Sequence, residues 1–434
     1  MNITNVYSIY SHSTGVCTDT RSIKEGSLFI ALKGESFNGN DYILASLEAG
    51  TSHAIADEKR SEFSGNSRIT IVDNGLVALQ SLAHHHRSKL KIPIIGLTGS
   101  NGKTTSKELL YAALSQTYST YATHGNLNNH IGVPLSLLEI NESHEIAIIE
   151  MGANHQKEIQ FLCSIAAPDF GYITNIGLAH LEGFGGEEGV YIGKKELFDF
   201  LKENDGKAFI NNDDPKVIRA SNGLSGISYG QSEKAIFQGV YSIENGLLSV
   251  QRWRDIDPFK RLIKTKLSGG YNFSNVMSAV TLARYFGVPD EKIKAGIESY
   301  IPENNRSQVE HTDLNNTVIV DCYNANPSSM LAAIDNLSND SFKNPFVILG
   351  DMLELGDSSF EKHQEILKLL EKKAIAGYFV GSEFLKAKDS FDNVIFFERT
   401  SDVVDYLKKN KLTNKSILLK GSRKLKLEQL LELL

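Results

Sequence analysis

The sequence has few cysteines and no long hydrophobic run. Only three of its 434 residues are cysteines (Cys17, Cys163 and Cys322), and they lie far apart without a CxxC pair. This argues against a disulfide framework or a structural zinc site and favours a reducing compartment. No apolar run approaches the length of a membrane span. The N-terminus, MNITNVYSIY, has no basic region followed by an apolar one, unlike a signal peptide. We therefore expect a cytoplasmic protein without membrane insertion.

An excess of positive charge is also missing. The net charge is −7, so no overall basic field attracts nucleic acid or anionic lipid. A site for an anionic substrate must then come from local lysines, arginines and backbone N–H groups. Hydrophobic residues make up 41% of the chain and charged residues 22%, as in globular proteins. The length allows about two to four domains.

Two segments are predicted to separate three domains. Pro93, in the sequence KIP, precedes a strand, and residues 302–308 (PENNRSQ) are polar and break helix. The first domain contains short β-rich pieces at 27–32 and 69–72, followed by a helical pattern near 76–88. The three predicted domains are residues 1–91, 92–305 and 306–434.

Beyond the first domain, apolar runs alternate with helical patterns. In the central domain the predicted strands are 94–98, 146–150, 170–175 and 208–211, and the first helix is 104–114. In the last domain the predicted strands are 317–320, 346–349, 378–380, 394–397 and 416–419. Such alternation predicts an α/β fold with parallel sheets covered on both faces, the last domain being a small, doubly wound, Rossmann-like unit. Ligands of such folds bind at the carboxyl ends of the strands.

The strongest local motif is GLTGSNGKTT at residues 96–105. Gly99 and Gly102 allow the backbone to curl so that its N–H groups point at phosphate oxygens. Lys103 supplies charge for the β- and γ-phosphates and Thr104 a hydroxyl for Mg²⁺, at the positive end of the next helix. Leu97 stands where the general motif has its first glycine, so the loop has the shorter TGxxGKT form. The motif predicts ATP binding by Thr98, Gly99, Ser100, Asn101, Gly102, Lys103, Thr104 and Thr105.

With this short loop the chain resembles the Mur ligases, and the resemblance covers nearly the whole sequence. Six further motifs carry it: GNLNNHIGVPLSLL (125–138), EMGANHQKEI (150–159), TNIGLAHLEGFG (174–185), DCYNANPSSM (321–330), LGDMLELG (349–356) and LLKGSRKLKLE (418–428). They are similar to the patterns of the member that acts last and adds D-Ala-D-Ala. Residues 19–40 resemble the family's UDP-sugar-binding segment, but Asn38 and Asn40 stand where the family usually has aspartate and histidine.

The resemblance implies a three-domain ligase: a UDP-sugar-binding α/β domain, a central ATPase domain and a C-terminal ligase domain. Its substrates would be ATP, UDP-N-acetylmuramoyl-tripeptide and D-Ala-D-Ala. The third residue of the tripeptide would be lysine or diaminopimelate. The tripeptide carboxylate would attack the γ-phosphate to form an acyl phosphate. The D-Ala-D-Ala amine would then displace phosphate and give the UDP-pentapeptide. We expect a monomer that acts on small molecules.

The resemblance also implies the catalytic and metal-binding residues. Lys103 would neutralise phosphate charge, while Thr104 and Glu150 would hold one Mg²⁺. His180 would bind a second Mg²⁺, although this hard cation ordinarily prefers oxygen ligands. Lys194, in the run GKKELF, would be carbamylated by CO₂ and so become a carboxylate-like ligand. Lys195 is the neighbouring alternative, and two solvated lysines on a helix are the plainer interpretation.

The remaining implied contacts surround the substrates. For the nucleotide they are Asn211, Asn212, Asp214, Arg306 and Asp321. For the third-domain face of the cleft they are Asn324, Asn326, Lys420 and Arg423, the last two being candidates for the D-Ala-D-Ala carboxylate. For the nucleotide sugar they are Thr20, Arg21, Lys33, Gly34, Asn126, Asn128 and Asn129. Because these residues come from several domains, the site should close across domains and protect the acyl phosphate from water.

Three features have both a functional interpretation and a simpler structural one. His363 follows LGDMLELG and belongs either to the cleft or to a helix cap. The tract His84–His85–His86 resembles a metal site, but adjacent helical residues point in different directions, so partly exposed histidines without function are expected. Cys322 lies within DCYNANP without a visible base or second thiol, which argues against a reactive role.

Other functions remain as alternatives. A sister ligase, either another Mur enzyme or a folylpolyglutamate synthase-like protein, would use the same ATP chemistry. A nucleotide-binding regulator would keep the fold but lose Lys103, Thr104, Glu150, His180 or Lys194, and all of these residues are present. The short loop and the lack of an NKxD segment argue against a P-loop kinase or GTPase.

Overall fold

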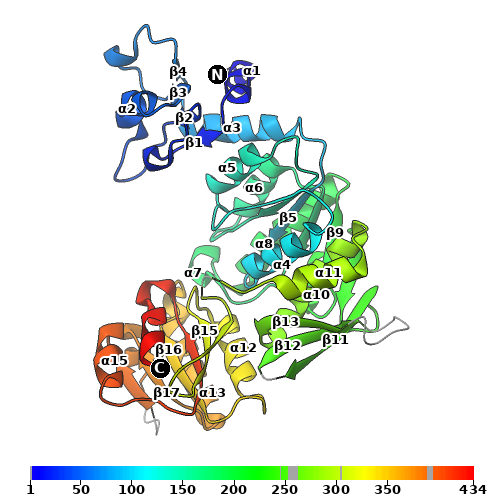
Figure 1. The fold of residues 1–434 in the computed structure, drawn as a ribbon, viewed down its shortest axis with the longest axis vertical. Coiled ribbons are helices and arrows are strands. Elements are labelled where there is room, and N and C mark those ends of the chain that lie inside the picture. The colour runs from blue at the N-terminus through cyan, green and yellow to red at the C-terminus, as the bar shows by residue number, and fades with distance from the viewer. Residues whose placement is uncertain (1, 245, 253–261, 304, 389–393) are drawn as a thin grey trace.

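The computed structural model describes residues 2–244, 246–252, 262–303, 305–388 and 394–434, which form three sheets in succession along the chain (Figure 1). The first sheet is wholly parallel, with the order β1-β2-β3-β4. Its strands are Val16–Cys17, Leu28–Ile30, His53–Ala56 and Ile69–Ile71. The helices of this part are α1 (Ile3–Ser11), α2 (Ile43–Glu48) and α3 (Gly75–Arg87).

The second sheet has nine strands in the order β13-β12-β11-β10-β9-β8-β5-β7-β6. They are β5 Ile94–Thr98, β6 Thr120–Ala122, β7 Ile146–Glu150, β8 Phe170–Ile173, β9 Lys207–Asn211, β10 Gly226–Gly230, β11 Phe237–Glu244, β12 Leu247–Arg252 and β13 Leu262–Ser268. From β6 to β11 neighbouring strands are parallel, whereas β12 is antiparallel to both β11 and β13. The predicted parallel sheet is therefore present, with an antiparallel extension that the sequence did not predict.

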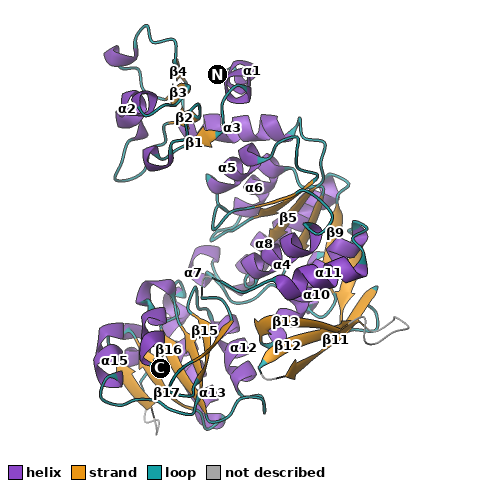
Figure 2. Cartoon of the chain, in the orientation of Figure 1, coloured by secondary structure: helices purple, strands orange, loops and turns teal. Residues whose placement is uncertain are grey.

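Helices cover both faces of the parallel part of this sheet (Figure 2). They are α4 Lys103–Leu114, α5 Gly132–Glu139, α6 Glu158–Ala166, α7 Leu181–Phe184, α8 Glu187–Glu203, α9 Pro215–Ala220, α10 Phe273–Tyr285 and α11 Asp290–Ser299. Apolar side chains of α4, α10 and α11 share one core cluster, and those of α3, α5, α6 and α8 share the other. Neighbouring residues of β5 alternate between them, since Ile94 belongs to the second cluster and Ile95 to the first.

The third sheet has six strands in the order β14-β15-β19-β16-β17-β18. They are β14 Gln308–His311, β15 Thr317–Asp321, β16 Pro345–Gly350, β17 Ala376–Val380, β18 Val394–Phe397 and β19 Ser416–Lys420, with helices α12 Pro327–Leu337, α13 Ser359–Lys372, α14 Ser382–Lys386 and α15 Thr400–Leu407. Only the edge strand β14, which the sequence did not predict, is antiparallel to its neighbour. The predicted α/β class is confirmed, and no helix in the described ranges is long and apolar enough to cross a membrane.

Helix α3 links the first sheet to the second. It packs against α1 of the N-terminal part and against α5 and α6 of the central part. His86 of this helix is buried and its Nε2 lies 2.8 Å from the carbonyl oxygen of Ile140. Arg87 donates to the carbonyl oxygens of Ala166 and Ala167. The expectation that all three histidines of the tract are partly exposed is thus wrong for His86, because this position faces the central domain.

Candidate active site

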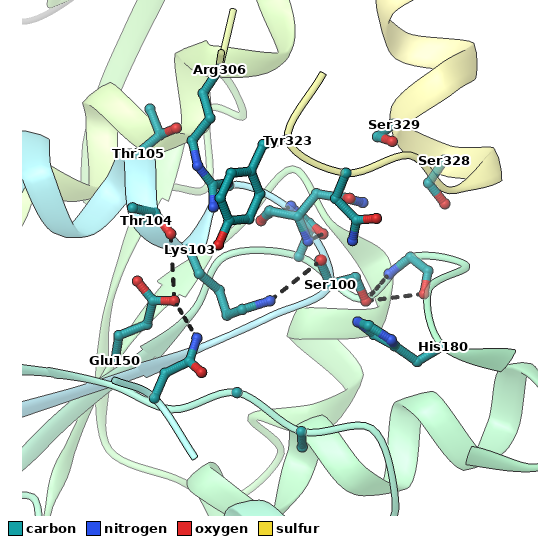
Figure 3. A pocket seen from close by; sticks show the side chains of 18 of the residues that line it. Ser100, Lys103, Thr104, Thr105, Glu150, His180, Arg306, Tyr323, Ser328 and Ser329 are labelled. Carbon is teal, nitrogen blue, oxygen red and sulfur yellow. Dashed lines mark hydrogen bonds between the residues drawn. The ribbon is translucent and has the colours of Figure 1, made fainter. Parts of the chain in front are cut away.

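A cleft of about 830 Å³ lies where the carboxyl ends of β5, β7 and β8 face the start of the third domain (Figure 3). The central domain contributes the phosphate loop, the loop after β6 and the ends of β7 and β8. The third domain contributes the end of β15, the start of α12 and Glu354. The predicted site residues that line this cleft are Ser100, Asn101, Gly102, Lys103, Thr104, Thr105, Asn126, Asn128, Asn129, Glu150, His180, Arg306, Asp321, Asn324 and Lys420.

Glycines and the end of β8 give the phosphate loop its shape. Gly99 and Gly102 have φ angles of +150° and +77°, which side chains of L residues rarely adopt. A Cβ on Gly99 would lie 1.9 Å from Thr174 Oγ1, so a larger residue has no space. Asn101 donates its backbone N–H to Asn175 Oδ1 and accepts from Thr174 Oγ1 through its carbonyl oxygen. The predicted strand 170–175 ends at Ile173 because Thr174 and Asn175 bind this loop instead.

Lys103 is the first residue of α4 and folds back over the loop. Its ammonium group donates to the carbonyl oxygen of Gly99 at 2.8 Å. Burial lowers the pKa of Lys103, while the nearby charge of Glu150 opposes this shift and that of Arg306 adds to it. A cation is thus held next to the curled N–H groups of the loop, as phosphate binding requires.

Glu150 ends β7 beside the phosphate-loop strand, and its side chain is only half satisfied. Oε1 accepts from Asn128 Nδ2 at 2.8 Å and lies 3.5 Å from Thr104 Oγ1. Oε2 is buried and has no hydrogen-bond partner in the described part of the chain. An unpartnered buried carboxylate oxygen is costly unless a cation or a donor reaches it. Together with the Thr104 hydroxyl, Glu150 therefore fits Mg²⁺, which prefers oxygen ligands.

A complete metal cage is not preformed. The described residues include no group of three or more histidine, cysteine or acidic side chains arranged to hold a metal ion. This agrees with the way proteins bind Mg²⁺, through one or two carboxylates with waters and substrate phosphates supplying the other ligands.

His180 follows β8 and points at the third domain. It has a φ of +53°, in the left-handed region, and its Nδ1 contacts a carboxylate oxygen of Glu354. This close contact with His180 is also the main cause of the lowered pKa of Glu354. Figure 3 shows His180 at the edge of the cleft together with Ser328 and Ser329 of α12.

Lys194 and Lys195 have different environments although both belong to α8. Lys194 is 1% exposed, and its amine donates to the carbonyl oxygen of Ala153, a residue that lines the cleft. Burial, followed by the charge of Lys103, lowers the pKa of Lys194 well below its usual value. Lys195 instead forms an ion pair with Asp199. Lys194 itself does not line the cleft but lies behind Ala153.

The third domain contributes a second group of charges. The Arg306 guanidinium stacks over the Tyr323 ring, 3.5 Å from its centroid, and Arg423 lies 5.0 Å from the same centroid. Lys420 is buried and forms an ion pair with Asp321 at 2.6 Å. The charges of Asp321 and Lys420 are therefore already balanced, while Arg306 faces the cleft from above (Figure 3).

The start of α12 joins the two domains. Asn326 caps this helix by accepting from the Ser329 N–H, and its Nδ2 donates to Asn101 Oδ1 in the phosphate loop at 2.7 Å. Ser328 Oγ accepts from the backbone N–H of Leu178 at 2.7 Å. The predicted closure across domains thus has a physical counterpart, because the third domain contacts the phosphate loop directly.

Several predicted residues lie outside the cleft. Asn211 Oδ1 accepts from the Asp213 N–H, and Asn212 lies beside it after β9. Asp214 caps α9 and accepts from the Ile176 N–H. Thr98 and Gly99 lie beneath the loop, and Asn326 and Arg423 lie behind the lining residues. His363 is buried within α13, where its Nε2 accepts from the Met352 N–H, so it belongs neither to the cleft nor to a helix cap.

The candidates for the nucleotide sugar in the first domain lie apart from the cleft and partly engage other residues. Arg21 pairs with Asp19, and Lys33 forms ion pairs with Asp57 and Glu58. Thr20 begins the short helical turn 20–22, and Gly34 packs under the exposed ring of Phe37. Asn40 is buried and exchanges hydrogen bonds with Asp57. Asn40 therefore stabilises this loop instead of facing solvent.

Tyr323, Ser328 and Glu354 are among the residues of the cleft that were not singled out from the sequence. All three lie within motifs that carried the resemblance, DCYNANPSSM and LGDMLELG. Their positions could be found from the motifs, but the contacts of Ser328 and Glu354 with the central domain depend on how the third domain docks.

The fold and this cleft define a nucleotide-binding α/β protein whose site lies between two domains. The Mur ligase middle domain matches residues 97–283, and the Mur ligase glutamate ligase domain matches residues 305–423. A UDP-N-acetylmuramoyl-tripeptide--D-alanyl-D-alanine ligase of Bacillus subtilis is 34% identical over 429 residues, which cover 96% of this chain and 92% of that protein. The chain belongs to the Mur ligase family and is of the MurF type.

Solved structures agree with this assignment. MurF from Acinetobacter baumannii is similar with a TM-score of 0.86 and 28% identity, covering 99% of this chain and 97% of that one. The MurF ligase from Thermotoga maritima, solved in complex with ADP, has a TM-score of 0.84 and 28% identity, covering 98% and 97%. The resemblance to the Mur ligases is thereby confirmed over the whole chain.

Proposed function

We propose that this chain joins D-Ala-D-Ala to UDP-N-acetylmuramoyl-tripeptide with ATP as the energy source. The observation that carries the proposal is the cleft, which combines a phosphate loop, a half-satisfied buried carboxylate and basic residues of a second domain. The B. subtilis relative, which aligns over nearly the full length, carries the name of this reaction. Its product would be the UDP-pentapeptide of peptidoglycan precursor synthesis, with ADP and phosphate.

The reaction needs charge neutralisation before any bond forms. The terminal carboxylate of the tripeptide would attack the γ-phosphorus, ADP would leave, and the D-Ala-D-Ala amine would then attack the acyl carbon and displace phosphate. Lys103 and the loop N–H groups would bind the phosphates, and Arg306, held by Tyr323, would face them from the third domain. Closing the cleft would keep water away from the acyl phosphate.

We propose Thr104 and Glu150 as the residues that hold the Mg²⁺ of ATP. The chemistry that the ion would supply there is positive charge that neutralises the phosphates. The support is the buried Oε2 of Glu150, which lacks a partner among the described residues. His180 at the cleft edge is the proposed ligand of a second ion.

We also propose that Lys194 is the carbamylated lysine. Burial lowers the pKa of Lys194 well below its usual value, which favours the free amine, and the free amine is the form that attacks CO₂. Its nitrogen would form a bond to the CO₂ carbon and lose a proton, leaving an anionic carbamate. Lys195 is a poor candidate because its ammonium group is engaged in an ion pair with Asp199 instead of being buried.

For the other two substrates we propose a binding region instead of individual contacts. We place the nucleotide sugar between the first domain (1–91) and the loop with Asn126, Asn128 and Asn129 in the central domain (92–305). We place D-Ala-D-Ala against the third domain (306–434), near Asn324. The enzyme would act as a monomer in the cytosol, where Cys17, Cys163 and Cys322 would stay reduced, as all three are free and buried here.

The test is phosphate release from ATP and Mg²⁺ with UDP-N-acetylmuramoyl-tripeptide and D-Ala-D-Ala, each omitted in turn. We expect release only with both substrates, and a UDP-pentapeptide by mass spectrometry. Turnover with a different acceptor or amino acid would make the protein a sister ligase. Nucleotide binding without turnover on any pair would make it a regulator.

A further inference from the structure

Two antiparallel parts of the fold, which the sequence did not predict, meet at the boundary between the central and third domains. One is the extension of the second sheet by β12 and β13, and the other is the edge strand β14 of the third sheet. Strand β14 lies against β13. Figure 1 shows α12 beside the same extension. No described residue of β12 or β13 lines the cleft. The extension thus supplies no group to the cleft, but it contacts the domain that completes it.

Helix α12 is attached to this extension near its C-terminal end. Asn336, in the last turn of the helix, donates through Nδ2 to Oγ of Ser268, the last residue of β13, at 2.9 Å. Both residues are buried. A hydrogen bond that is removed from water is costly to break, because each partner would be left unsatisfied. The bond therefore fixes the position of this end of α12 on the central domain.

An apolar contact lies beside this hydrogen bond. Gly246 directly precedes β12, and the ring of Phe342, which follows α12, covers it. A Cβ on Gly246 would lie 2.8 Å from Phe342 Cζ, so the ring is in close contact with the backbone. Phe342 is buried and belongs to the same core cluster as Ile334 and Leu337 of α12. The C-terminal end of α12 is thus held on the extension by a polar and an apolar contact.

The N-terminal end of the same helix contacts the phosphate loop. Asn326 caps α12 through Oδ1 and donates through Nδ2 to Asn101 Oδ1 at 2.7 Å. The backbone of Asn101 is held from the other side by Thr174 and Asn175. About 15 Å of continuous helix separates Asn326 from Asn336, given a rise of 1.5 Å per residue. A hydrogen-bonded helix of this length moves as one body, so a shift at one end displaces the other.

We propose that Asn336 is a positioning residue for the phosphate loop, which acts through α12 from the end of the helix that lies away from the loop. Its partner is Ser268 of the antiparallel extension. The extension holds the third domain at the position in which Asn326 contacts Asn101. The proposal rests on the proposed binding of ATP by this loop. It gives a role in nucleotide binding to residues that touch no substrate.

The direct test is hydrogen–deuterium exchange of the full chain without nucleotide, read by mass spectrometry on peptides that contain residues 98–105. Asn336→Ala and Ser268→Ala remove the same bond, each from a different domain. We expect the amides of the phosphate loop to exchange about tenfold faster in both variants, because a loop that loses outer support opens more often. Asn410→Ala is the matched control and should leave the loop unchanged. It removes a hydrogen bond from Nδ2 to the carbonyl oxygen of Tyr406, within the third domain.

The second readout is nucleotide affinity, measured by calorimetry with ADP and Mg²⁺ and no other substrate. We expect the Kd of ADP to rise about tenfold in Asn336→Ala and in Ser268→Ala, and not in Asn410→Ala. The double variant Asn336→Ala/Ser268→Ala should bind no more weakly than the single variants, because both substitutions remove one bond. In the ligase assay, KM for ATP should rise by a larger factor than kcat falls.

The proposal is wrong if the phosphate loop exchanges at the wild-type rate in the folded variants. A lower melting temperature with wild-type exchange in the loop would mean that the pair only stabilises the fold. If Asn336→Ala does not fold, Ser268→Ala decides, because it leaves α12 unchanged. A wild type that forms no pentapeptide would contradict the proposed function alone, since the exchange measurement needs neither nucleotide nor turnover.

Discussion

At the scale of single residues, the most informative comparison is between Lys194 and Lys195. They are neighbours on α8, but only Lys194 is buried, next to the carbonyl oxygen of Ala153 and 4.9 Å from the centroid of the Phe184 ring. Burying a charged amine without a carboxylate partner is costly, and this burial lowers the pKa of Lys194 well below its usual value. The sequence left the choice between the two lysines open, and this difference in burial supports Lys194.

We predict that Lys194→Ala lowers kcat for pentapeptide formation on the order of a hundredfold, because a carbamate ligand is lost. High bicarbonate should not restore the variant, whereas it should restore wild-type enzyme that has been depleted of CO₂. Steady-state phosphate release at several bicarbonate concentrations measures both effects.

Lys195→Ala is the control for this experiment. It removes a surface pair spaced i,i+4, worth about 0.5 kcal/mol, and should leave kcat within about twofold of the wild type. Near-normal turnover in Lys194→Ala, or an equal loss in both variants, would contradict the assignment of Lys194.

At the scale of secondary-structure elements, α13 depends on a buried histidine. His363 Nε2 accepts from the Met352 N–H at 3.0 Å, Nδ1 lies 2.7 Å from the carbonyl oxygen of Ser359, and the ring packs edge-on against Phe384. Burial lowers the pKa of His363 below its usual 6.5. Protonation therefore favours the unfolded state, and the stability that the neutral ring provides is full above pH 6.5 and falls as the pH drops below it.

We predict that His363→Gln lowers the free energy of unfolding at pH 7.5 by about 1–3 kcal/mol, because a buried hydrogen-bond pattern is lost. The wild type should lose stability as the pH falls below 6.5, and the variant should lose less over the same range. Urea unfolding at a series of pH values measures this difference. His311→Gln, at an exposed position of the same domain, should follow the wild-type pH dependence; if His363→Gln does so too, the prediction is wrong.

The elements that the sequence predicted well are those buried on both faces. Residues 94–98 and 146–150, which are buried throughout, were predicted as strands with the bounds that the structure has. A continuous apolar run identifies such strands without further context. Strand β13, missed together with β11 and β12, has no continuous apolar run, because the exposed Lys264 and Lys266 interrupt it.

The candidate site likewise has one part that the sequence predicted and another part that it did not. The phosphate loop is contiguous in the sequence, so its residues were predicted together and lie together. The contacts of Glu354 with His180 and of Asn326 with Asn101 join segments far apart in the chain. No local pattern encodes such contacts, because they arise when a separate domain docks.

At the scale of the whole molecule, the docking of the third domain decides whether the site exists. The two domains come close together at Gly177, where there is no space for a side chain. A Cβ on Gly177 would lie 2.8 Å from Ser328 Oγ and 3.1 Å from Ser328 Cβ. Gly177 belongs to the central domain and Ser328 to α12. We predict that Gly177→Ala pushes α12 away and lowers kcat/KM for ATP by about tenfold or more, since small misplacements of catalytic groups are costly. Steady-state kinetics measure the loss, and small-angle X-ray scattering should show a larger radius of gyration.

A second substitution separates this clash from a local defect in the phosphate loop. Ser328→Gly removes both atoms that the new methyl group would meet, so the double variant Gly177→Ala/Ser328→Gly should regain most of the lost activity. Ser328→Gly alone also removes the hydrogen bond to the Leu178 N–H and should cost less than Gly177→Ala. Additive losses in the double variant would mean that the two residues act independently. The activity of this enzyme would then not depend on the contact between α12 and the central domain.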